Sequence, residues 1–225
     1  MYNRVLVFSG GCLDTEFAKE YLANEKFDLV ICADSGLDDA YRLGVKADYI
    51  IGDFDSVSGN VFEKYKKGDV TESKEARFIK FPPEKDSTDT DIALEYAMEQ
   101  NPDEIVILGA TGGRMDHFLA NVNILMKPLK YGIPTYIVDK YNKIYLIDKD
   151  TVIKRKSLWG KYISFQPLTE IVKNVRLSGL KYILDGEDLT IGKSLTVSNE
   201  MADGTDEAMI SFVTGVFIVI EARDA

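Results

Sequence analysis

The chain contains little cysteine and almost no histidine, with two Cys and one His in 225 residues. Cys12 and Cys32 each lie beside a strand-like segment, where we interpret them as small buried hydrophobic residues and not as a disulfide. With His117 as the one imidazole, a metal site built from His and Cys is excluded. A metal centre here would have to use oxygen ligands.

Excess positive charge and long apolar runs are also missing. The formal net charge is -10 at pH 7, which argues against binding to a nucleic-acid backbone, because that binding needs basic patches. No apolar run approaches the roughly 20 residues that cross a bilayer, and the chain begins with a strand-like segment instead of a signal peptide. We therefore expect a cytoplasmic protein with no nucleic-acid or membrane partner. An acidic enzyme can still bind ATP, because a metal supplies positive charge locally.

Strand and helix patterns alternate through the first part of the chain. Strands are expected at residues 4–8, 29–33, 49–51, 77–81 and 104–108, helices at 15–23, 88–100 and 114–127 with a short one running to Arg42, and an irregular charged stretch at 63–75. In the helix at 114–127, the spacing of an apolar stripe facing the core is followed by Met115, Phe118, Leu119, Val122, Leu125 and Met126. The alternation predicts a mainly parallel sheet covered on both faces.

The pattern changes near Tyr141. Short β-rich runs follow at residues 144–147, 162–165, 171–177, 195–197, 208–213 and 216–222, separated by Gly, Asp and Asn. No amphipathic helix is evident among them. The sequence therefore predicts an α/β N-terminal domain over residues 1–140 and an antiparallel all-β C-terminal domain over residues 141–225.

Two carboxylates, Asp53 and Asp55, directly follow a strand-like apolar segment. In an extended backbone they would point to the same side, while Phe54 would turn toward a core. Carboxylates at the mouth of a sheet suit a hard cation such as Mg²⁺, which completes its shell with water and phosphate oxygens. The pair therefore favours phosphoryl-transfer chemistry, and the alternative is a solvated acidic loop.

Other polar or glycine-rich segments follow the neighbouring strands, at residues 9–11, 34–36 and 109–114. Ligands of open α/β sheets bind outside the carboxyl ends of the strands, so this shared placement favours a site over a solvated loop. The glycines at 109–113 open a helix, where free N–H groups attract phosphate, and Arg114 offers a bidentate clamp. The loop is neither a Walker motif nor a dinucleotide fingerprint, and a tight strand–helix turn is the alternative.

Further candidates lie at the starts of two helices. Thr88 and Asp91 have the spacing of a capping box, which accounts for both without any function. The negative charge of Asp89 is favourable at the positive end of the helix dipole, and a contact with metal or substrate is an open alternative. Asp116 and His117 lie off the apolar stripe and are expected to face the site, with a structural cap as the alternative for His117.

Taken together, these segments resemble the thiamine pyrophosphokinase (thiamine diphosphokinase) family. The matching segments are residues 33–36 (ADSG), 52–56 (GDFDS), 86–89 (DSTD), 109–121 (GATGGRMDHFLAN), 178–182 (SGLKY) and 197–200 (VSNE), in the family's order. The resemblance implies a catalytic α/β domain that binds ATP and Mg²⁺, and a C-terminal β-sandwich domain for thiamine binding and dimerisation. It also implies a homodimer with active sites between subunits and the reaction ATP + thiamine → AMP + thiamine diphosphate.

The same resemblance implies roles for individual residues. The family pattern places around Mg²⁺ and the ATP phosphates four carboxylates, Asp34, Asp53, Asp55 and Asp89, the last three of which are also the candidate catalytic residues. Candidate nucleotide contacts are Asp34, Ser35, Gly36, Thr88, Gly112, Gly113 and Arg114. Candidate thiamine contacts are Asp116, His117, Ser198 and Asn199. Tyr182 stands where eukaryotic relatives often carry Trp, so the aromatic surface for the substrate rings differs here.

Three rival interpretations compete with this assignment. The first is that the same scaffold pyrophosphorylates another hydroxymethyl compound, such as a pterin. A nucleotide- or thiamine-sensing module would bind ligand without forming AMP, which fits poorly with an intact acidic cluster. A purely structural interpretation treats the β domain as an interaction module and the acidic segments as solvated loops.

Overall fold

The computed structural model describes residues 2–67, 76–81 and 87–225. It divides into two compact units, Met1–Lys140 and Tyr141–Ala225. Asp86, the first residue of the 86–89 segment, lies outside the described residues. Among the helices of the described ranges, none has the length and apolar composition needed to span a membrane.

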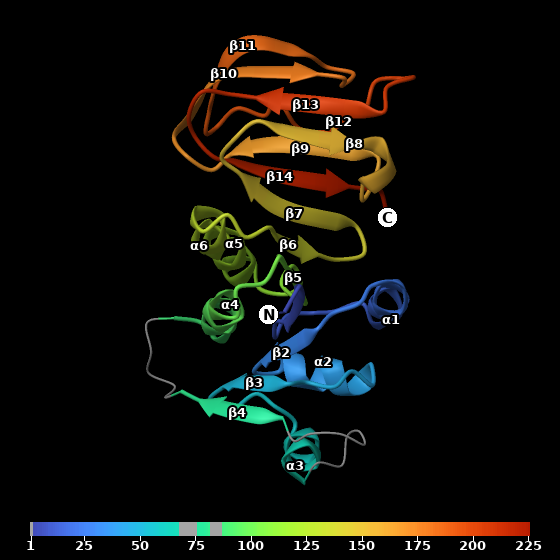
Figure 1. Ribbon diagram of the computed structural model, residues 1–225, viewed down its shortest axis with the longest axis vertical. Coiled ribbons are helices and arrows are strands. Elements are labelled where there is room, and N and C mark those ends of the chain that lie inside the picture. Colours follow the sequence, from blue (N-terminus) through green and yellow to red (C-terminus); the bar gives the residue numbers. More distant parts are fainter. Residues whose placement is uncertain (1, 68–75, 82–86) are drawn as a thin grey trace. The chain divides into compact units, whose positions relative to one another are not determined.

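The first unit is an α/β fold built on a parallel sheet (Figure 1). Its elements in chain order are β1 (Arg4–Phe8), α1 (Thr15–Asn24), β2 (Leu29–Ala33), α2 (Gly36–Arg42), β3 (Tyr49–Gly52), α3 (Gly59–Lys67), β4 (Arg77–Lys80), α4 (Asp89–Glu99), β5 (Glu104–Leu108), α5 (Met115–Ile124), α6 (Met126–Lys130) and β6 (Thr135–Val138). Its strands run in the spatial order β6-β5-β1-β2-β3-β4, and the recorded pairs among them are parallel. The predicted mainly parallel α/β arrangement is confirmed.

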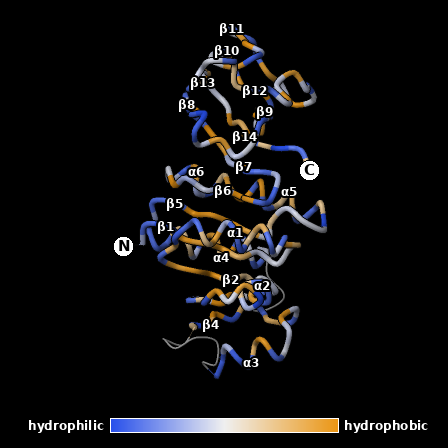
Figure 2. Tube along the Cα trace, turned by 90° about the vertical axis from the view of Figure 1, so that its right-hand side faces the viewer, coloured by the Kyte–Doolittle hydropathy of each residue, from blue (hydrophilic) through white to orange (hydrophobic). Residues whose placement is uncertain are grey.

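The central strands are apolar on both faces because helices cover both sides of the sheet. Val5, Leu6, Val7 and Phe8 of β1 are fully buried, and every residue of β2 is buried. These strands are among the hydrophobic parts of the trace in Figure 2. Helices α1, α2 and α3 lie on one side of the sheet and α4, α5 and α6 on the other (Figure 1), as right-handed crossovers require. The strand order therefore reverses between β1 and β5.

The prediction of a single helix over residues 114–127 is wrong in two respects. It ends at Ile124, and α6 follows after Leu125, because the ring of Pro128 conflicts with the carbonyl group four residues earlier. Met115 and Leu119 of the predicted core stripe are 64% and 58% exposed, whereas Leu125 is buried. The reason is that α5 packs mainly on α4 and α6 and does not lay that stripe on the sheet.

The stretch at 63–75, predicted as irregular, begins inside a helix. Residues 63–67 belong to α3, and residues 68–75 lie outside the described ranges. The helix buries Val61 and Tyr65 and turns its lysines outward, so its apolar residues are too few for the pattern to stand out against the charge.

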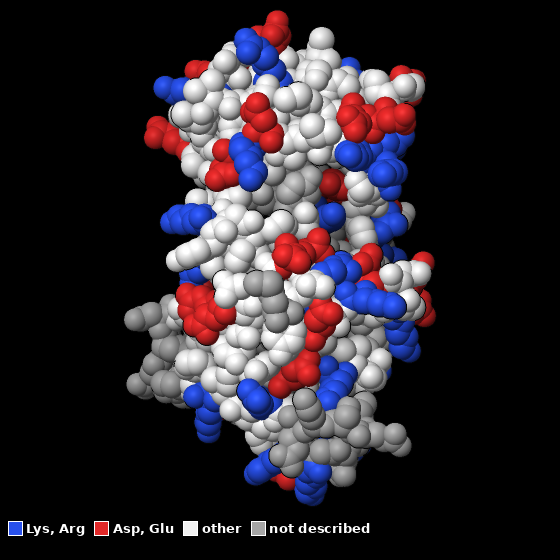
Figure 3. Space-filling view, viewed as in Figure 1, with Lys and Arg blue, Asp and Glu red and all other residues white. Residues whose placement is uncertain are grey.

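On the face shown in Figure 3, Lys and Arg side chains are interspersed with Asp and Glu.

The second unit consists of antiparallel sheets. Its strands are β7 (Asn142–Ile147), β8 (Thr151–Lys154), β9 (Tyr162–Pro167), β10 (Ile171–Ser178), β11 (Leu184–Thr190), β12 (Asn199–Glu200), β13 (Glu207–Ser211) and β14 (Phe217–Ala222), with a short 3-10 helix at Arg155–Ser157. One layer has the order β12-β9-β14-β7 and the other β11-β10-β13-β8. Residues from both layers, including Phe165, Val175 and Phe217, form one buried cluster. The predicted all-β, sandwich-like C-terminal part is confirmed.

Three details of the second unit differ from prediction, and the first is that strand β8 was not predicted. Residues 195–197 form a turn, and the strand follows at Asn199–Glu200. Strand β11 was missed because its sequence, LDGEDLT, has polar residues at most positions. It is an edge strand, so few of its side chains need to be apolar, and Leu189 alone among them is buried.

Candidate functional site

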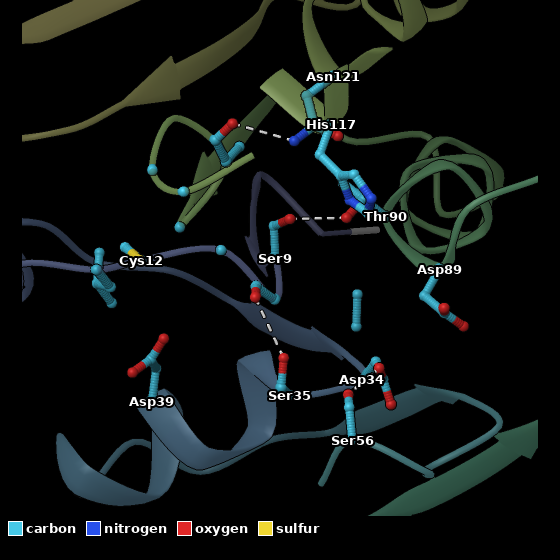
Figure 4. A pocket seen from close by; sticks show the side chains of 18 of the residues that line it. Ser9, Cys12, Asp34, Ser35, Asp39, Ser56, Asp89, Thr90, His117 and Asn121 are labelled. Atoms are coloured by element: carbon cyan, nitrogen blue, oxygen red, sulfur yellow. Dashed lines mark hydrogen bonds between the residues drawn. The ribbon is translucent and has the colours of Figure 1, made fainter. Parts of the chain in front are cut away.

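A cavity of about 690 Å³ opens in the first unit at the carboxyl ends of the strands, where the strand order reverses. The predicted site residues that line it are Asp34, Ser35, Thr88, Asp89, Gly112, Gly113, Arg114 and His117. Several of these side chains point into the cavity in Figure 4. The predicted residues of this unit that do not line it are Gly36, Asp53, Asp55 and Asp116.

Asp34 follows β2 and adopts a left-handed backbone with φ 48°, which Asp tolerates better than most residues. Its Oδ2 accepts a hydrogen bond from the Ser56 hydroxyl group. Its Oδ1 is buried and makes no hydrogen bond within the described residues. Burial raises the pKa of Asp34, and the nearby charges of Asp89, Asp53 and Asp55 raise it further. A buried carboxylate oxygen without a partner fits a position where a cation binds.

Asp53 and Asp55 converge on Asp34. One carboxylate oxygen from each of the three residues lies within 4.8 Å of the other two. The Asp55 backbone N–H donates to Asp53 Oδ1 at 3.1 Å, which forms a turn across the pair. A side-chain hydrogen bond with Asp53 and the charge of that residue raise the pKa of Asp55.

The predicted cause of this convergence is wrong. Phe54 has φ 68°, so the backbone of the pair is not extended, and the carboxylates meet through a turn. The Phe54 ring does turn toward apolar neighbours, as expected: its centroid lies 5.2 Å from that of Phe62 in α3 and 5.9 Å from that of Phe78 in β4. Aromatic packing therefore holds an unfavourable backbone conformation beneath the carboxylates.

Helix α4 brings Asp89 to the same edge. Thr88 is its N-cap, as predicted, and the Thr88 side chain accepts from the Asp91 N–H at 3.2 Å, while the Asp91 carboxylate pairs with Lys127. A Cβ placed on Gly52 would lie 3.1 Å from Asp89 Oδ1, so the Asp89 carboxylate reaches the end of β3. Next to it, the hydroxyl groups of Thr90 and Ser9 are joined by a buried hydrogen bond of 2.7 Å, which fixes α4 to the end of β1.

The glycine loop after β5 packs against the loop after β1. The Gly11 N–H donates to the Gly109 carbonyl at 2.9 Å. A Cβ on Gly112 would lie 2.5 Å from Cys12 Cβ, so only glycine permits this approach. The buried Asn121 side chain donates to the Ala110 carbonyl at 3.0 Å and fixes the loop to α5. The loop is therefore held in place before any ligand binds.

Arg114 and Asp116 form a bidentate ion pair at the start of α5. Arg114 Nη2 lies 2.5 Å from Asp116 Oδ2, and its Nε donates to Oδ1 at 3.1 Å. The hydrogen bond from Arg114 lowers the pKa of Asp116 to about 2. Both side chains are largely exposed, and the His117 N–H donates to the same carboxylate at 2.9 Å. Asp116 orients Arg114 at the rim, while His117 lines the cavity.

Gly36 has a packing reason to be glycine. It is buried at the start of α2, and an added Cβ would collide with the Phe8 carbonyl group of β1. This contact accounts for the residue without a ligand. Its predicted nucleotide contact stays a prediction.

The predicted residues of the second unit form a local network. Asn199 is 2% exposed, its Oδ1 accepts from the Tyr182 N–H at 3.0 Å, and its Nδ2 donates to the Tyr182 carbonyl at 2.7 Å. Tyr182 itself is 59% exposed. Ser198 is exposed with φ 57°, and its N–H donates to the Ser164 hydroxyl group. The segments 178–182 and 197–200 therefore lie side by side, with Asn199 holding the backbone of Tyr182.

Replacing Asn199 with Ala should destabilise the protein by about 1–3 kcal/mol, because it removes a buried side chain whose two part-buried hydrogen bonds hold the Tyr182 N–H and carbonyl groups. Urea unfolding measures the change. Asn123→Ala, at an exposed position of α5, is the matched control and should change stability by less than about 0.5 kcal/mol. Equal stability of the two variants would contradict the role of Asn199.

Two family models match this chain. The model described as "Thiamin pyrophosphokinase, catalytic domain" covers residues 20–137, more than half of the chain, and the one described as "Thiamin pyrophosphokinase, vitamin B1 binding domain" covers residues 150–217. The chain belongs to the thiamine pyrophosphokinase family. The resemblance inferred from the sequence segments is therefore confirmed.

Relatives within the family are similar along nearly the whole chain. The thiamine pyrophosphokinase of Bacillus subtilis is 34% identical over 207 residues, with 89% of this chain and 90% of that protein covered. A crystal structure of the Bacillus subtilis thiamine pyrophosphokinase has a TM-score of 0.86 at 31% identity and covers 99% of this chain and 100% of that one. The Geobacillus thermodenitrificans thiamin pyrophosphokinase has a TM-score of 0.83 at 28% identity, with 99% and 98% covered.

Several residues of the cavity in this family member were missed by sequence reasoning. Ser9, Asp39, Arg42, Thr90 and Asn121 all line it. Ser9 belongs to a segment noted for its position after a strand, and Asn121 belongs to the 109–121 segment. Asp39 and Arg42 carried no local signal, because charged residues on a short helix are ordinary.

Proposed function

We propose that this chain transfers the pyrophosphoryl group of ATP to the hydroxyl group of thiamine, giving thiamine diphosphate and AMP. The observation that carries the proposal is the cavity at the strand-order reversal in a member of this family: the fixed glycine loop, Asp34 and Asp89 line it, and Asp53 and Asp55 converge on Asp34. We also propose, from the same family resemblance, a cytoplasmic homodimer with active sites between subunits.

The residues proposed to hold Mg²⁺ are Asp34, Asp53, Asp55 and Asp89. Their fit rests on the oxygen-only donor set, on the spacing within 4.8 Å for the first three, and on the buried Asp34 Oδ1 that has no hydrogen-bond partner within the described residues. When bound, Mg²⁺ supplies positive charge that offsets the charge of the ATP phosphates.

The ATP phosphates are proposed to lie against the glycine loop. Gly112 and Gly113 present backbone to the cavity at the start of α5, where N–H groups and the helix dipole favour anions. Arg114 is oriented by Asp116 at the rim and offers a planar donor pair for phosphate oxygens. Ser35, Gly36 and Thr88 are the further proposed nucleotide contacts.

Thiamine is proposed to contact Asp116, His117 and Ser198. Asn199 is proposed to act through Tyr182, because its polar side-chain atoms already bind the backbone of that residue. The exposed Tyr182 ring offers an aromatic surface to the substrate rings.

The reaction forms a bond between the thiamine hydroxyl oxygen and the β-phosphorus of ATP and breaks the bond from that phosphorus to the α–β bridging oxygen. The electron pair of the broken bond stays on the bridging oxygen, which leaves as part of AMP, and the hydroxyl proton is released. Such transfers depend mainly on positioning and electrostatics, and no residue is assigned as general base. Asp55 and Asp89 are the candidates for assisting the proton's departure.

Incubation of the purified protein with ATP, Mg²⁺ and thiamine should yield AMP and thiamine diphosphate in equal amounts, because the pyrophosphoryl group moves as one unit. Chromatography with mass detection measures both products. EDTA should abolish turnover, and thiamine monophosphate, whose hydroxyl group is blocked, should not react.

Each rival predicts a different result. Preference for a hydroxymethylpterin with AMP release would favour the pterin interpretation. Binding of ATP or thiamine without AMP would favour a sensor. Protection against thermal unfolding by ATP that depends on Mg²⁺ would count against a purely structural role. Formation of ADP in place of AMP would overturn the proposed reaction.

A further inference from the structure

The segment of residues 53–58, which carries the two aspartates of the turn after β3, is hydrogen-bonded at two places to the start of α2. The Ser56 hydroxyl group donates to Asp34 Oδ2, and the two side chains lie next to each other in Figure 4. Ser58 donates twice to Asp38 in the first turn of α2. Its hydroxyl group lies 3.0 Å and its backbone nitrogen 3.1 Å from Asp38 Oδ2. Asp34 and Asp38 therefore hold the segment from the two sides of the helix start.

Ser58 is also the residue at which α3 is anchored. Its carbonyl group accepts from the Val61 N–H at 2.9 Å and from the Phe62 N–H at 3.0 Å. The Phe62 ring in turn packs with its centroid 5.2 Å from that of Phe54, which lies between the two aspartates. By binding Ser58, Asp38 therefore fixes the end of the segment together with the first turn of the helix that supports it.

The Asp38 carboxylate is used differently from those of the acidic cluster. Within the described residues that cluster comprises Asp34, Asp53 and Asp55, so Asp38 lies outside it, although it lines the same cavity. The Ser58 N–H lies within hydrogen-bond distance of both Asp38 oxygens, at 3.3 and 3.1 Å. Hydrogen bonds to a charged acceptor are stronger than those between neutral groups. Asp38 is therefore placed to hold a backbone and not to complete the cluster.

The acidic cluster needs such support before a cation binds. Its three carboxylates have oxygens within 4.8 Å of one another, so without a cation they repel. The repulsion favours movement of segment 53–58 away from Asp34. The Ser56 bond ends on a member of the cluster itself, whereas the Asp38 bonds lie outside it and oppose the movement. If the segment moves away, the apparent affinity for a cation falls in proportion to the fraction of molecules that keep the competent arrangement.

We infer that Asp38 is a positioning residue for the acidic cluster: by binding Ser58 it keeps segment 53–58 next to Asp34 before a cation binds. The inference rests on the proposed function for the identity of the cation and of its nucleotide. It adds to that function a carboxylate that acts on metal binding through Ser58.

Asp38→Ala should raise the Mg²⁺ concentration needed for half-maximal activity about 10-fold, because the ligands are all present and only their arrangement before binding is lost. At saturating Mg²⁺, kcat should return to within about 2-fold of the wild type, and the KM for thiamine should not change. Steady-state kinetics at a series of Mg²⁺ concentrations measure both.

A second readout does not depend on turnover. The unfolding midpoint is followed as Mg²⁺ is added at a fixed concentration of α,β-methylene-ATP, in which the bond cleaved in the proposed reaction is replaced by one that resists cleavage. The Mg²⁺ concentration that raises the midpoint by a fixed amount should increase in Asp38→Ala by the same factor as in the kinetics. Glu16→Ala, which removes an exposed carboxylate from the first turn of α1, is the matched control and should behave like the wild type.

Two further variants test whether Asp38 acts through Ser58. Ser58→Ala removes the hydroxyl bond and keeps the backbone bond, so it should shift the Mg²⁺ dependence in the same direction by a smaller factor. The double variant Asp38→Ala/Ser58→Ala should match Asp38→Ala alone, because that change already removes both bonds. Asp38→Asn keeps an acceptor oxygen and should restore part of the Mg²⁺ dependence.

Two results would overturn the inference. One is a loss of kcat in Asp38→Ala that saturating Mg²⁺ does not restore, which would make Asp38 a direct contact of metal or substrate. The other is a lower unfolding midpoint without ligand combined with an unchanged Mg²⁺ dependence, which would make its role purely structural. Absence of AMP formation by the wild type would instead overturn the proposed function, and the midpoint titration would still test Asp38.

Discussion

Asp55→Asn should lower turnover by between about 100-fold and 1,000-fold while leaving the fold at least as stable as the wild type. The activity falls because the variant loses a negative oxygen from the cluster proposed to hold Mg²⁺, and removal of one such electrostatic contact commonly costs this much. Asp53→Asn should lower turnover comparably, because Asp53 belongs to the same cluster. Steady-state kinetics at saturating ATP and thiamine measure the loss.

The stability of Asp55→Asn should equal or exceed that of the wild type, because the carboxylates of the cluster repel one another without a cation. Folding raises the pKa of Asp34 and Asp55 above the ordinary value of 3.8. A carboxyl group with a raised pKa contributes stability that is fully present below its unfolded pKa and is lost as the pH rises through its folded pKa. At neutral pH both ionised groups therefore destabilise the fold, and Asp55→Asn removes part of this destabilisation. Thermal unfolding in EDTA at pH 7 should show a midpoint equal to or above that of the wild type.

A matched control distinguishes an effect of the acidic cluster from an effect of net charge. Asp203→Asn changes the same charge at an exposed position of the second unit and should leave turnover and stability unchanged. Addition of Mg²⁺ and ATP should raise the unfolding midpoint of the wild type and of this control more than that of Asp55→Asn. Wild-type kinetics in both Asp53→Asn and Asp55→Asn would exclude the metal assignment.

Gly112→Ala should lower kcat/KM for ATP about 100-fold. The added methyl group would lie 2.5 Å from Cys12 Cβ and 2.9 Å from the Cys12 carbonyl oxygen, so one of the two loops must move. A displacement near 1 Å in a group that positions a substrate can cost about this factor. The change should act mainly on ATP, because the loop is proposed to hold its phosphates, and kinetics with each substrate varied in turn measure the distinction.

Gly59→Ala is the control for this substitution. Gly59 begins α3, and an added Cβ there would meet no atom within 4 Å. Its φ lies outside the left-handed range, so alanine fits without strain and should leave kcat/KM unchanged. If Gly112→Ala matched this control, the close packing of the glycine loop would have no part in binding ATP.

The fold was largely predictable because each central strand of the first unit is a short apolar run. Strands β1 and β2 have no polar residue between their ends, so their bounds and their burial on both faces follow from composition alone. Helix α5 was less predictable, because the spacing of Met115 and Leu119 indicates an apolar stripe but does not say which neighbour covers it. Edge strand β11 lacked an apolar pattern altogether.

The location of the candidate site followed from a simple rule, since loops after parallel strands share one edge of a sheet. Its internal geometry did not. The turn that joins Asp53 to Asp55 depends on the positive φ of Phe54, and a sequence gives no direct sign of that conformation. The contact of Asn199 with Tyr182 links segments 17 residues apart, and only the folded chain shows that they meet.

The aromatic group beneath the acidic cluster has a consequence for inherited variation in this protein. Phe54, Phe62 and Phe78 come from a loop, a helix and a strand, and their rings pack with centroid distances of 5.2 to 5.9 Å. The strained backbone between the two aspartates persists only while this packing opposes it. A harmful allele can therefore arise at Phe62 or Phe78, in a gene whose polar site residues are all intact.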